Sequence, residues 1–230
     1  MDLIEGGLKN PIRHWYYSHK YWFISSSSHF RKGSDNLLVD IGAGSALFSK
    51  ELLRTNRVRR SIAVDTGYPE DFDDPDLNLS YRQKIDFAGH THFLLTDVLE
   101  HVQDDRTFLR EIASHADKHS VFIITVPAHM NLWSGHDVYL KHYRRYTKNG
   151  LQALVKSAGL TVRKSRYTYS TLFPIALFQR KFFGSKSVNS QMKDNGFVVS
   201  SILRFLLFPD RWISILPFGV SLYLEASKDD

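Results

Sequence analysis

The chain has 230 residues, which is enough for one globular domain with an elaboration but leaves little room for two independent domains. Its 43% hydrophobic and 23% charged residues indicate a packed core, and the lack of cysteine excludes disulfides, thiolate zinc sites, iron–sulfur clusters and cysteine nucleophiles. The net charge of +6 is compatible with an anionic partner such as nucleic acid, an acidic substrate or a membrane surface.

The N-terminal part of the chain is rich in aromatic residues. Residues 1–5 contain neither a basic nor an apolar stretch and so predict no secretory signal. Aromatic and histidine residues crowd positions 14–23, and serines follow at 25–28, so we interpret residues 1–35 as a helical lid.

Alternating apolar runs and amphipathic segments begin near residue 36. Strands are predicted over residues 37–41, 61–65, 79–83, 92–97, 121–127, 160–169 and 221–226. Helices are predicted over residues 45–55, 104–116 and 148–158, and two aromatic-rich helices over 173–183 and 197–208.

This alternation predicts an α/β fold with one domain over residues 1–230. We expect a Rossmann-like, doubly wound, mostly parallel seven-stranded sheet with helices on both faces and an aromatic-rich helical insertion before the last strand. In this division, residues 36–169 form a cofactor-binding core, 170–220 the insertion, and 221–230 the last strand and tail.

A glycine-rich turn follows the first predicted strand. Gly42 and Gly44 allow the backbone to turn tightly and to approach a ligand, and Asp65 ends the next strand. Because ligands of open α/β sheets bind at the carboxyl ends of the strands, Asp65 is placed to accept hydrogen bonds from both hydroxyls of an adenosine ribose. Leu47 stands where a nicotinamide-binding fingerprint has its third glycine, and no phosphate-loop lysine follows, so both of those sites are excluded.

Several motifs together resemble the class I S-adenosylmethionine-dependent methyltransferases. They are Asp40-Ile41-Gly42-Ala43-Gly44, Asp65 and the D-V-L-E-H-V run at 97–102, which resembles the branch of ubiquinone-type and glycan-cluster small-molecule methyltransferases. Segments at 126–128, 132–134, 136–137 and 142–147 resemble the same branch, so that the resemblance covers roughly residues 36–168. The chain departs from the pattern at Ala46, where many members have glycine, and at 117–120, which lacks the usual Pro-Gly-Gly.

The resemblance implies that the chain binds S-adenosylmethionine and releases S-adenosylhomocysteine. It implies a set of cofactor-binding residues: Asp40, Gly42, Ala43, Gly44, Asp65, Thr66, Asp86 and Asp97. Within this set, Asp97 would lie beside the methionine end of the cofactor, and Asp86 is the candidate for contact with the adenine amine.

Catalysis of methyl transfer depends mainly on positioning, and a base is needed only for a poorly acidic hydroxyl acceptor. We expect His101 and His136 to be the candidate bases, since both follow strands at the carboxyl edge of the sheet. The alternative for His101 is a hydrogen bond within its own loop.

Residues after the fifth strand are the candidates for contact with the acceptor: His129, Trp133, His142, Arg144, Arg145 and Tyr146. The two arginines could clamp a phosphate or carboxylate, or could form only a solvated basic turn. The histidines and Asp137 have a spacing that matches no closed zinc pattern, so we expect no metal.

Methyl transfer to a small molecule, a sugar or a lipid-linked acceptor, at oxygen, is therefore the predicted function. The alternatives are an RNA methyltransferase, which the missing N-P-P-Y-type segment disfavours, and a non-catalytic membrane-associated scaffold with this fold. The aromatic segments 14–23 and 173–218 either pack as core and lid or form a membrane-resting surface. We expect a cytoplasmic protein, with contact at the inner face of the membrane in the second case; the oligomeric state is not predicted.

Overall fold

The computed structural model describes residues 10–33, 35–183, 196–212 and 216–229. Eight strands form one sheet: β1 (Leu37–Ile41), β2 (Arg60–Val64), β3 (Phe72–Asp74), β4 (Leu79–Arg82), β5 (His92–Thr96), β6 (Val121–Pro127), β7 (Thr161–Thr168) and β8 (Ser221–Ser227). Seven helices accompany them in the described part of the chain: α1 (Trp15–Ser25), α2 (Leu47–Arg54), α3 (Asp105–His115), α4 (Gly135–Tyr139), α5 (Lys148–Ser157), α6 (Phe173–Phe183) and α7 (Gly196–Leu207).

The strand order is β3-β4-β2-β1-β5-β6-β8-β7. Strands β4, β2, β1, β5 and β6 pair in parallel, whereas β8 runs antiparallel between β6 and β7. This arrangement confirms the predicted Rossmann-like class. The sheet has one strand more than the predicted seven, because the acidic loop contributes the three-residue β3 as an antiparallel edge on β4.

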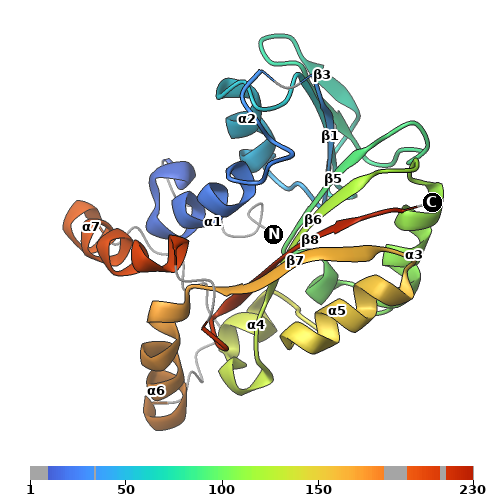
Figure 1. Ribbon diagram of the computed structural model, residues 1–230. Coiled ribbons are helices and arrows are strands. Elements are labelled where there is room, and N and C mark those ends of the chain that lie inside the picture. The colour runs from blue at the N-terminus through green and yellow to red at the C-terminus, as the bar shows by residue number, and fades with distance from the viewer. Residues whose placement is uncertain (1–9, 34, 184–195, 213–215, 230) are drawn as a thin grey trace.

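Helices cover both faces of the sheet (Figure 1). Successive side chains of a strand point to opposite faces of the sheet, and the buried residues of β5 show this alternation. Phe93 and Leu95 pack in the apolar cluster that contains residues of α3 and α5. Leu94 packs in the cluster that contains residues of α1 and α2. Both clusters are apolar, as expected for parallel strands that are buried on both sides.

The predicted aromatic-rich insertion contributes α6 and α7 between β7 and β8. Figure 1 shows both helices projecting beyond one end of the sheet, where α7 lies near α1. Among the residues that the structure describes, no helix is long and apolar enough to cross a bilayer.

Candidate active site

Three neighbouring strands end side by side at the candidate site. Because β2, β1 and β5 are parallel neighbours, the turns that follow them place Gly42, Asp65 and Asp97 at one edge of the sheet. This is the edge at which open α/β sheets bind their ligands.

The glycine turn after β1 depends on a backbone conformation that favours glycine. Gly42 has φ +64°, and its amide donates a hydrogen bond to the Val64 carbonyl at 2.7 Å. A Cβ at this position would lie 2.7 Å from Val98 Cγ2, closer than real contacts allow. Ala46 begins α2 with φ 57°, also left-handed, which explains why glycine suits this position.

Asp65 fastens the glycine turn to the loop after β2. Its Oδ2 accepts a hydrogen bond from the Gly44 amide at 2.9 Å, and its Oδ1 accepts one from the Gly67 amide at 2.8 Å. Each carboxylate oxygen keeps a further lone pair, so Asp65 can still accept hydrogen bonds from a ligand.

Asp40 lies near the end of β1 and fastens that strand to α2. Its buried carboxylate accepts a hydrogen bond from the Ser49 hydroxyl at 2.7 Å, and the Ser61 hydroxyl donates in turn to Ser49 at 2.9 Å. These contacts fasten β1 to α2. With Ala43, Asp40 also lines a small cavity of about 30 Å³ beside the glycine turn.

A cavity of about 1080 Å³ opens in front of the strand ends. The predicted cofactor residues that line it are Gly42, Asp65, Thr66, Asp86 and Asp97. Apolar side chains line it as well, among them Ile85 and Phe87 on the Asp86 loop and Val98 after β5. Its size and its mixture of apolar walls with a few carboxylates are typical of a small-molecule site.

Asp97 is buried in a polar cluster that the N-terminal helix completes. Lys20 of α1 forms an ion pair with Asp97 Oδ2, and the Tyr16 hydroxyl donates to the same oxygen at 3.3 Å. The Thr125 hydroxyl donates to Oδ1 at 3.1 Å. The sequence motifs did not single out Lys20, because it lies far from them in the chain; its place among apolar residues of a predicted helix was the only available signal.

Glu100, His101 and His142 come together beside Asp97. The His101 and His142 rings meet edge to face with centroids 4.6 Å apart. His101 Nε2 is buried without a hydrogen-bond partner among the described residues. Burial and the neighbouring His142 lower the pKa of His101 to about 4, so the ring is neutral near pH 7.

Glu100 is fully buried, and both of its carboxyl oxygens lack a hydrogen-bond partner in the described part of the chain. Burial, reinforced by the charge of Asp97, raises the pKa of Glu100 well above its ordinary value. One ligand atom from each of Glu100, His101 and His142 lies within 4.8 Å of the others, a geometry that could hold a divalent cation. The sequence-based expectation of no metal concerned the histidines after β6 together with Asp137. It did not consider Glu100 and His101 as ligands.

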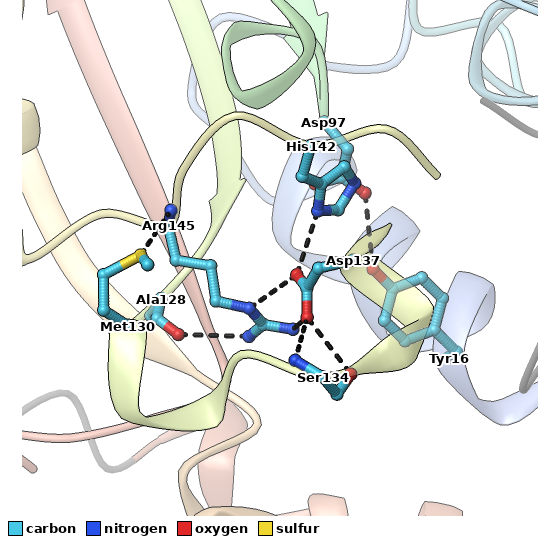
Figure 2. A network of polar contacts seen from close by, with 8 residues as sticks. All are labelled: Tyr16, Asp97, Ala128, Met130, Ser134, Asp137, His142 and Arg145. Carbon is cyan, nitrogen blue, oxygen red and sulfur yellow. Dashed lines mark hydrogen bonds and ion pairs between the residues drawn. The ribbon is translucent and has the colours of Figure 1, made fainter. Parts of the chain in front are cut away.

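Asp137 organises the loop after β6 (Figure 2). Its carboxylate accepts hydrogen bonds from His142 Nδ1 at 3.0 Å, from Arg145 Nε at 2.7 Å and from the Ser134 amide at 2.8 Å. Burial alone would raise the pKa of Asp137, but the hydrogen bonds from His142 and Arg145 outweigh it and hold that pKa well below its usual range. Arg145 also donates to the Ala128 carbonyl at 3.2 Å, so Asp137 and Arg145 together hold His142 against His101.

None of the six predicted acceptor residues, His142 and Arg145 included, lines the large cavity. Arg144 and Tyr146 both contact Asp105 of α3, at 2.8 Å and 2.7 Å, and so fasten the loop to that helix. The His129 ring stacks on Tyr167 with centroids 4.8 Å apart. Trp133 is half-buried just before α4.

His136 is half-buried at the start of α4 and lines neither cavity. Of the two predicted bases, the structure therefore brings only His101 into the cavity that the cofactor candidates line.

Comparison with solved structures shows the same fold in many proteins. A chain from the complex of the Haloferax volcanii Trm112 methyltransferase activator with a methyltransferase is 16% identical, with a TM-score of 0.56, over 96% of this chain and 91% of that one. A S-adenosylmethionine-dependent methyltransferase from Archaeoglobus fulgidus is 16% identical, with a TM-score of 0.54, over 96% and 95%. A sarcosine dimethylglycine methyltransferase from Galdieria sulphuraria is 12% identical, with a TM-score of 0.55, over 94% and 86%.

The search of curated proteins found no match. The family model described as a methyltransferase domain, in contrast, matches residues 23–165, more than half of the chain. That segment contains the glycine turn, Asp65, Asp97 and the His101–His142 pair. The chain therefore belongs to the methyltransferase domain family and is an S-adenosylmethionine-dependent methyltransferase of class I.

Proposed function

We propose that this methyltransferase transfers its methyl group to a hydroxyl oxygen of a small molecule, a sugar or a lipid-linked acceptor, and that His101 accepts the hydroxyl proton. One observation carries this proposal: the unpartnered Nε2 of His101 belongs to a residue that lines the same cavity as Asp65 and Asp97. A neutral imidazole at the cofactor cavity is the group that a poorly acidic hydroxyl requires.

The residues of the cavity fit the cofactor. Asp65 retains lone pairs for the two ribose hydroxyls, Asp86 and Phe87 would flank the adenine, and Asp97 would face the positively charged methionine end. The absence of a Cβ at Gly42 lets the strand ends approach each other closely at this point. When bound, S-adenosylmethionine supplies an electrophilic methyl group on a sulfonium and leaves as S-adenosylhomocysteine.

The proposed role requires one particular tautomer of His101. In that tautomer Nδ1 carries the proton, and Nε2, which has no hydrogen-bond partner in the described part of the chain, presents its lone pair. The pKa of about 4 keeps that lone pair available at neutral pH. With cofactor and acceptor bound, Nε2 would take the proton of the acceptor hydroxyl as that oxygen attacks the methyl group, and S-adenosylhomocysteine would be the leaving group.

The loop after β6 serves to position this histidine. Asp137 and Arg145 hold His142, whose ring meets the His101 ring edge to face. We therefore assign Arg144, Arg145 and Tyr146 to loop positioning, since their polar groups already contact Asp105 or Asp137. We keep His129 and Trp133 as candidates for contact with the part of an acceptor that extends beyond the large cavity. The His129 ring stacks on Tyr167 and lies 5.3 Å from the Phe173 ring.

The acceptor class can be tested with radiolabelled S-adenosylmethionine and a panel of nucleotide sugars, lipid-linked sugars, small amines and RNA. We expect label on hydroxyl-bearing acceptors. With such an acceptor, His101→Gln is expected to lower kcat by about 100-fold or more, the usual contribution of a general base, without changing the affinity for S-adenosylmethionine. Phe72→Ser, on the far edge strand β3, is the control that should leave kcat unchanged.

Three results would contradict the proposal. They are label only on amines, as the name of the Galdieria neighbour would suggest, label only on RNA, or an unchanged kcat in His101→Gln. A loss of activity on treatment with a chelator, restored by Zn²⁺ or Mn²⁺, would instead assign Glu100, His101 and His142 to a metal site.

A further inference from the structure

The insertion between β7 and β8 carries most of the large apolar side chains that the protein exposes. In the described part of the chain, nine of the thirteen exposed large hydrophobic residues lie in this insertion: Ile175, Phe178, Phe182, Val199, Ile202, Phe205, Leu206, Phe208 and Trp212. Phe205 is 79% exposed and Trp212 is 74% exposed. Such a concentration on a soluble domain marks an interaction surface.

The exposed residues follow the helical period. On α6 they occupy positions 175, 178 and 182, and on α7 positions 199, 202, 205 and 206. Residues spaced by three or four positions share one side of a helix, so each helix presents an apolar stripe to solvent.

The opposite side of α7 is anchored to the body of the protein. Leu207 is buried, and the fully buried Asp210 that follows it pairs with His19 of α1 at 3.0 Å. Asp210 also accepts a hydrogen bond from the Ser170 amide at 3.0 Å, at the end of β7. The exposed stripe is therefore an outward-facing surface of a fixed helix.

The charges around the stripes are positive. Across residues 173–183 and 196–212, the basic residues are Arg180, Lys181, Arg204 and Arg211, and the one acidic residue is the buried Asp210. Lys181 and Arg204 are exposed beside the stripes. The Arg211 guanidinium lies over the Phe208 ring, 5.9 Å from its centroid, as expected for a long cationic side chain that crosses apolar surface.

We propose that α6 and α7 form a peripheral membrane-binding surface that takes the headgroup region of a bilayer containing anionic phospholipids. Exposed Phe, Ile and Trp side chains enter the boundary between headgroups and acyl chains, while neighbouring Lys and Arg side chains meet lipid phosphates. A protein partner would match the apolar stripes equally well, but the uniformly positive charge around them favours the anionic lipid surface. The proposal does not depend on the identity of the methyl acceptor.

Co-sedimentation of the whole chain with vesicles tests this surface. We expect binding to mixed phosphatidylcholine–phosphatidylglycerol vesicles, weaker binding to phosphatidylcholine alone, and a decrease with salt. Ile202→Ser combined with Phe205→Ser is expected to weaken partitioning by about 100-fold, since two apolar side chains lose their burial. Lys181→Glu and Arg204→Glu are each expected to weaken binding to the anionic vesicles by about fivefold or more.

The matched control is Phe72→Ser, an exposed apolar residue on β3 at the other end of the molecule. It should bind vesicles like the original protein. The variants on α6 and α7 should keep their circular dichroism melting curve, since their side chains are exposed. All variants, Phe72→Ser included, should keep their affinity for S-adenosylmethionine, since none of these side chains lines either cavity.

The proposal is overturned if the original protein stays in the supernatant with anionic vesicles, or if the paired substitution leaves sedimentation unchanged. It is also overturned if light scattering finds a dimer that the same substitution dissociates while vesicles bind neither form. In that case a second copy of the chain covers the surface.

Discussion

Lys20 on α1 and Asp97 at the end of β5 form a buried ion pair, with only 3% and 4% of their side chains exposed. The pair joins the N-terminal helix to the motif carboxylate, which lines the large cavity at the strand ends. The Lys20 ammonium thus balances the charge of the Asp97 carboxylate without a ligand.

Removing one partner of this pair should destabilise the fold strongly. Lys20→Met leaves the Asp97 carboxylate buried without its cation, which typically costs about 3–5 kcal/mol of unfolding free energy. Urea denaturation of the two single variants and of Lys20→Met/Asp97→Asn measures the coupling. The double variant should be more stable than Lys20→Met; equal stabilities would contradict a coupled pair.

Glu100→Gln should keep or raise the stability at neutral pH. Burial raises the pKa of Glu100, because the buried site disfavours the ionised carboxylate. The folded protein therefore bears a free-energy cost for Glu100 at neutral pH, and a neutral amide of similar shape avoids that cost. Thermal melts near pH 7 would compare the variant with the original protein. A marked fall in Tm would indicate that the ionised carboxylate has a partner that binds there.

Asp65→Ala should weaken S-adenosylmethionine binding by about 100-fold or more, because two hydroxyl hydrogen bonds to a charged acceptor are lost. Calorimetric titration with S-adenosylmethionine and S-adenosylhomocysteine measures the change. Asp65→Asn is the milder control, since one amide oxygen remains to accept from a backbone amide. Affinity that is unchanged in Asp65→Ala would remove Asp65 from the cofactor site.

Ala46→Gly should be neutral or stabilising, by up to about 1 kcal/mol. Ala46 has φ 57°, and an L-residue with a Cβ loses about 1–2 kcal/mol there, which the greater chain entropy of glycine in the unfolded state partly offsets. Ala43→Gly, three residues earlier and outside the left-handed region, should be destabilising in the same unfolding experiment. If both substitutions had the same effect, strain at Ala46 would not be the cause.

Stability should fall as the pH decreases from 6.5 toward about 4. Burial and the nearby His29 lower the pKa of His92 to about 4, so in this window the unfolded chain binds a proton that the folded chain resists. The contribution is fully present above pH 6.5 and is lost as the pH falls through about 4. Each unit by which the pKa of His92 differs between the folded and unfolded chain corresponds to about 1.4 kcal/mol of unfolding free energy. Solvent screening reduces this contribution at the half-buried side chain.

Urea denaturation of the original protein and of His92→Gln across this window isolates the contribution of His92. The variant should lose less stability on acidification. Other groups such as His101 and Glu100 contribute equally to the pH dependence of both proteins. If the plots of unfolding free energy against pH were parallel for the two proteins, His92 would not contribute to that dependence.

Much of the fold follows from local sequence. Continuous apolar runs such as 121–127 predict buried parallel strands, and their carboxyl ends must share an edge, so Gly42, Asp65 and Asp97 could be placed together without a structure. Three-residue β3 escaped prediction because its pairing with β4, rather than its own polar sequence, makes it a strand.

The contact between His101 and His142 shows what sequence periodicity alone leaves open. The D-V-L-E-H-V motif pointed to His101, but the choice between His101 and His136 depends on loop packing, and no local pattern states that Asp137 holds His142 against His101. Lys20 likewise belongs to a helix whose contacts with β5 arise only when the chain folds. The sequence by itself determined the parallel strands of the sheet, the edge at which they end and the family, because short-range periodicity and local motifs govern these. Only the tertiary structure decided which side chains meet there, because contacts between distant segments depend on how loops and helices pack.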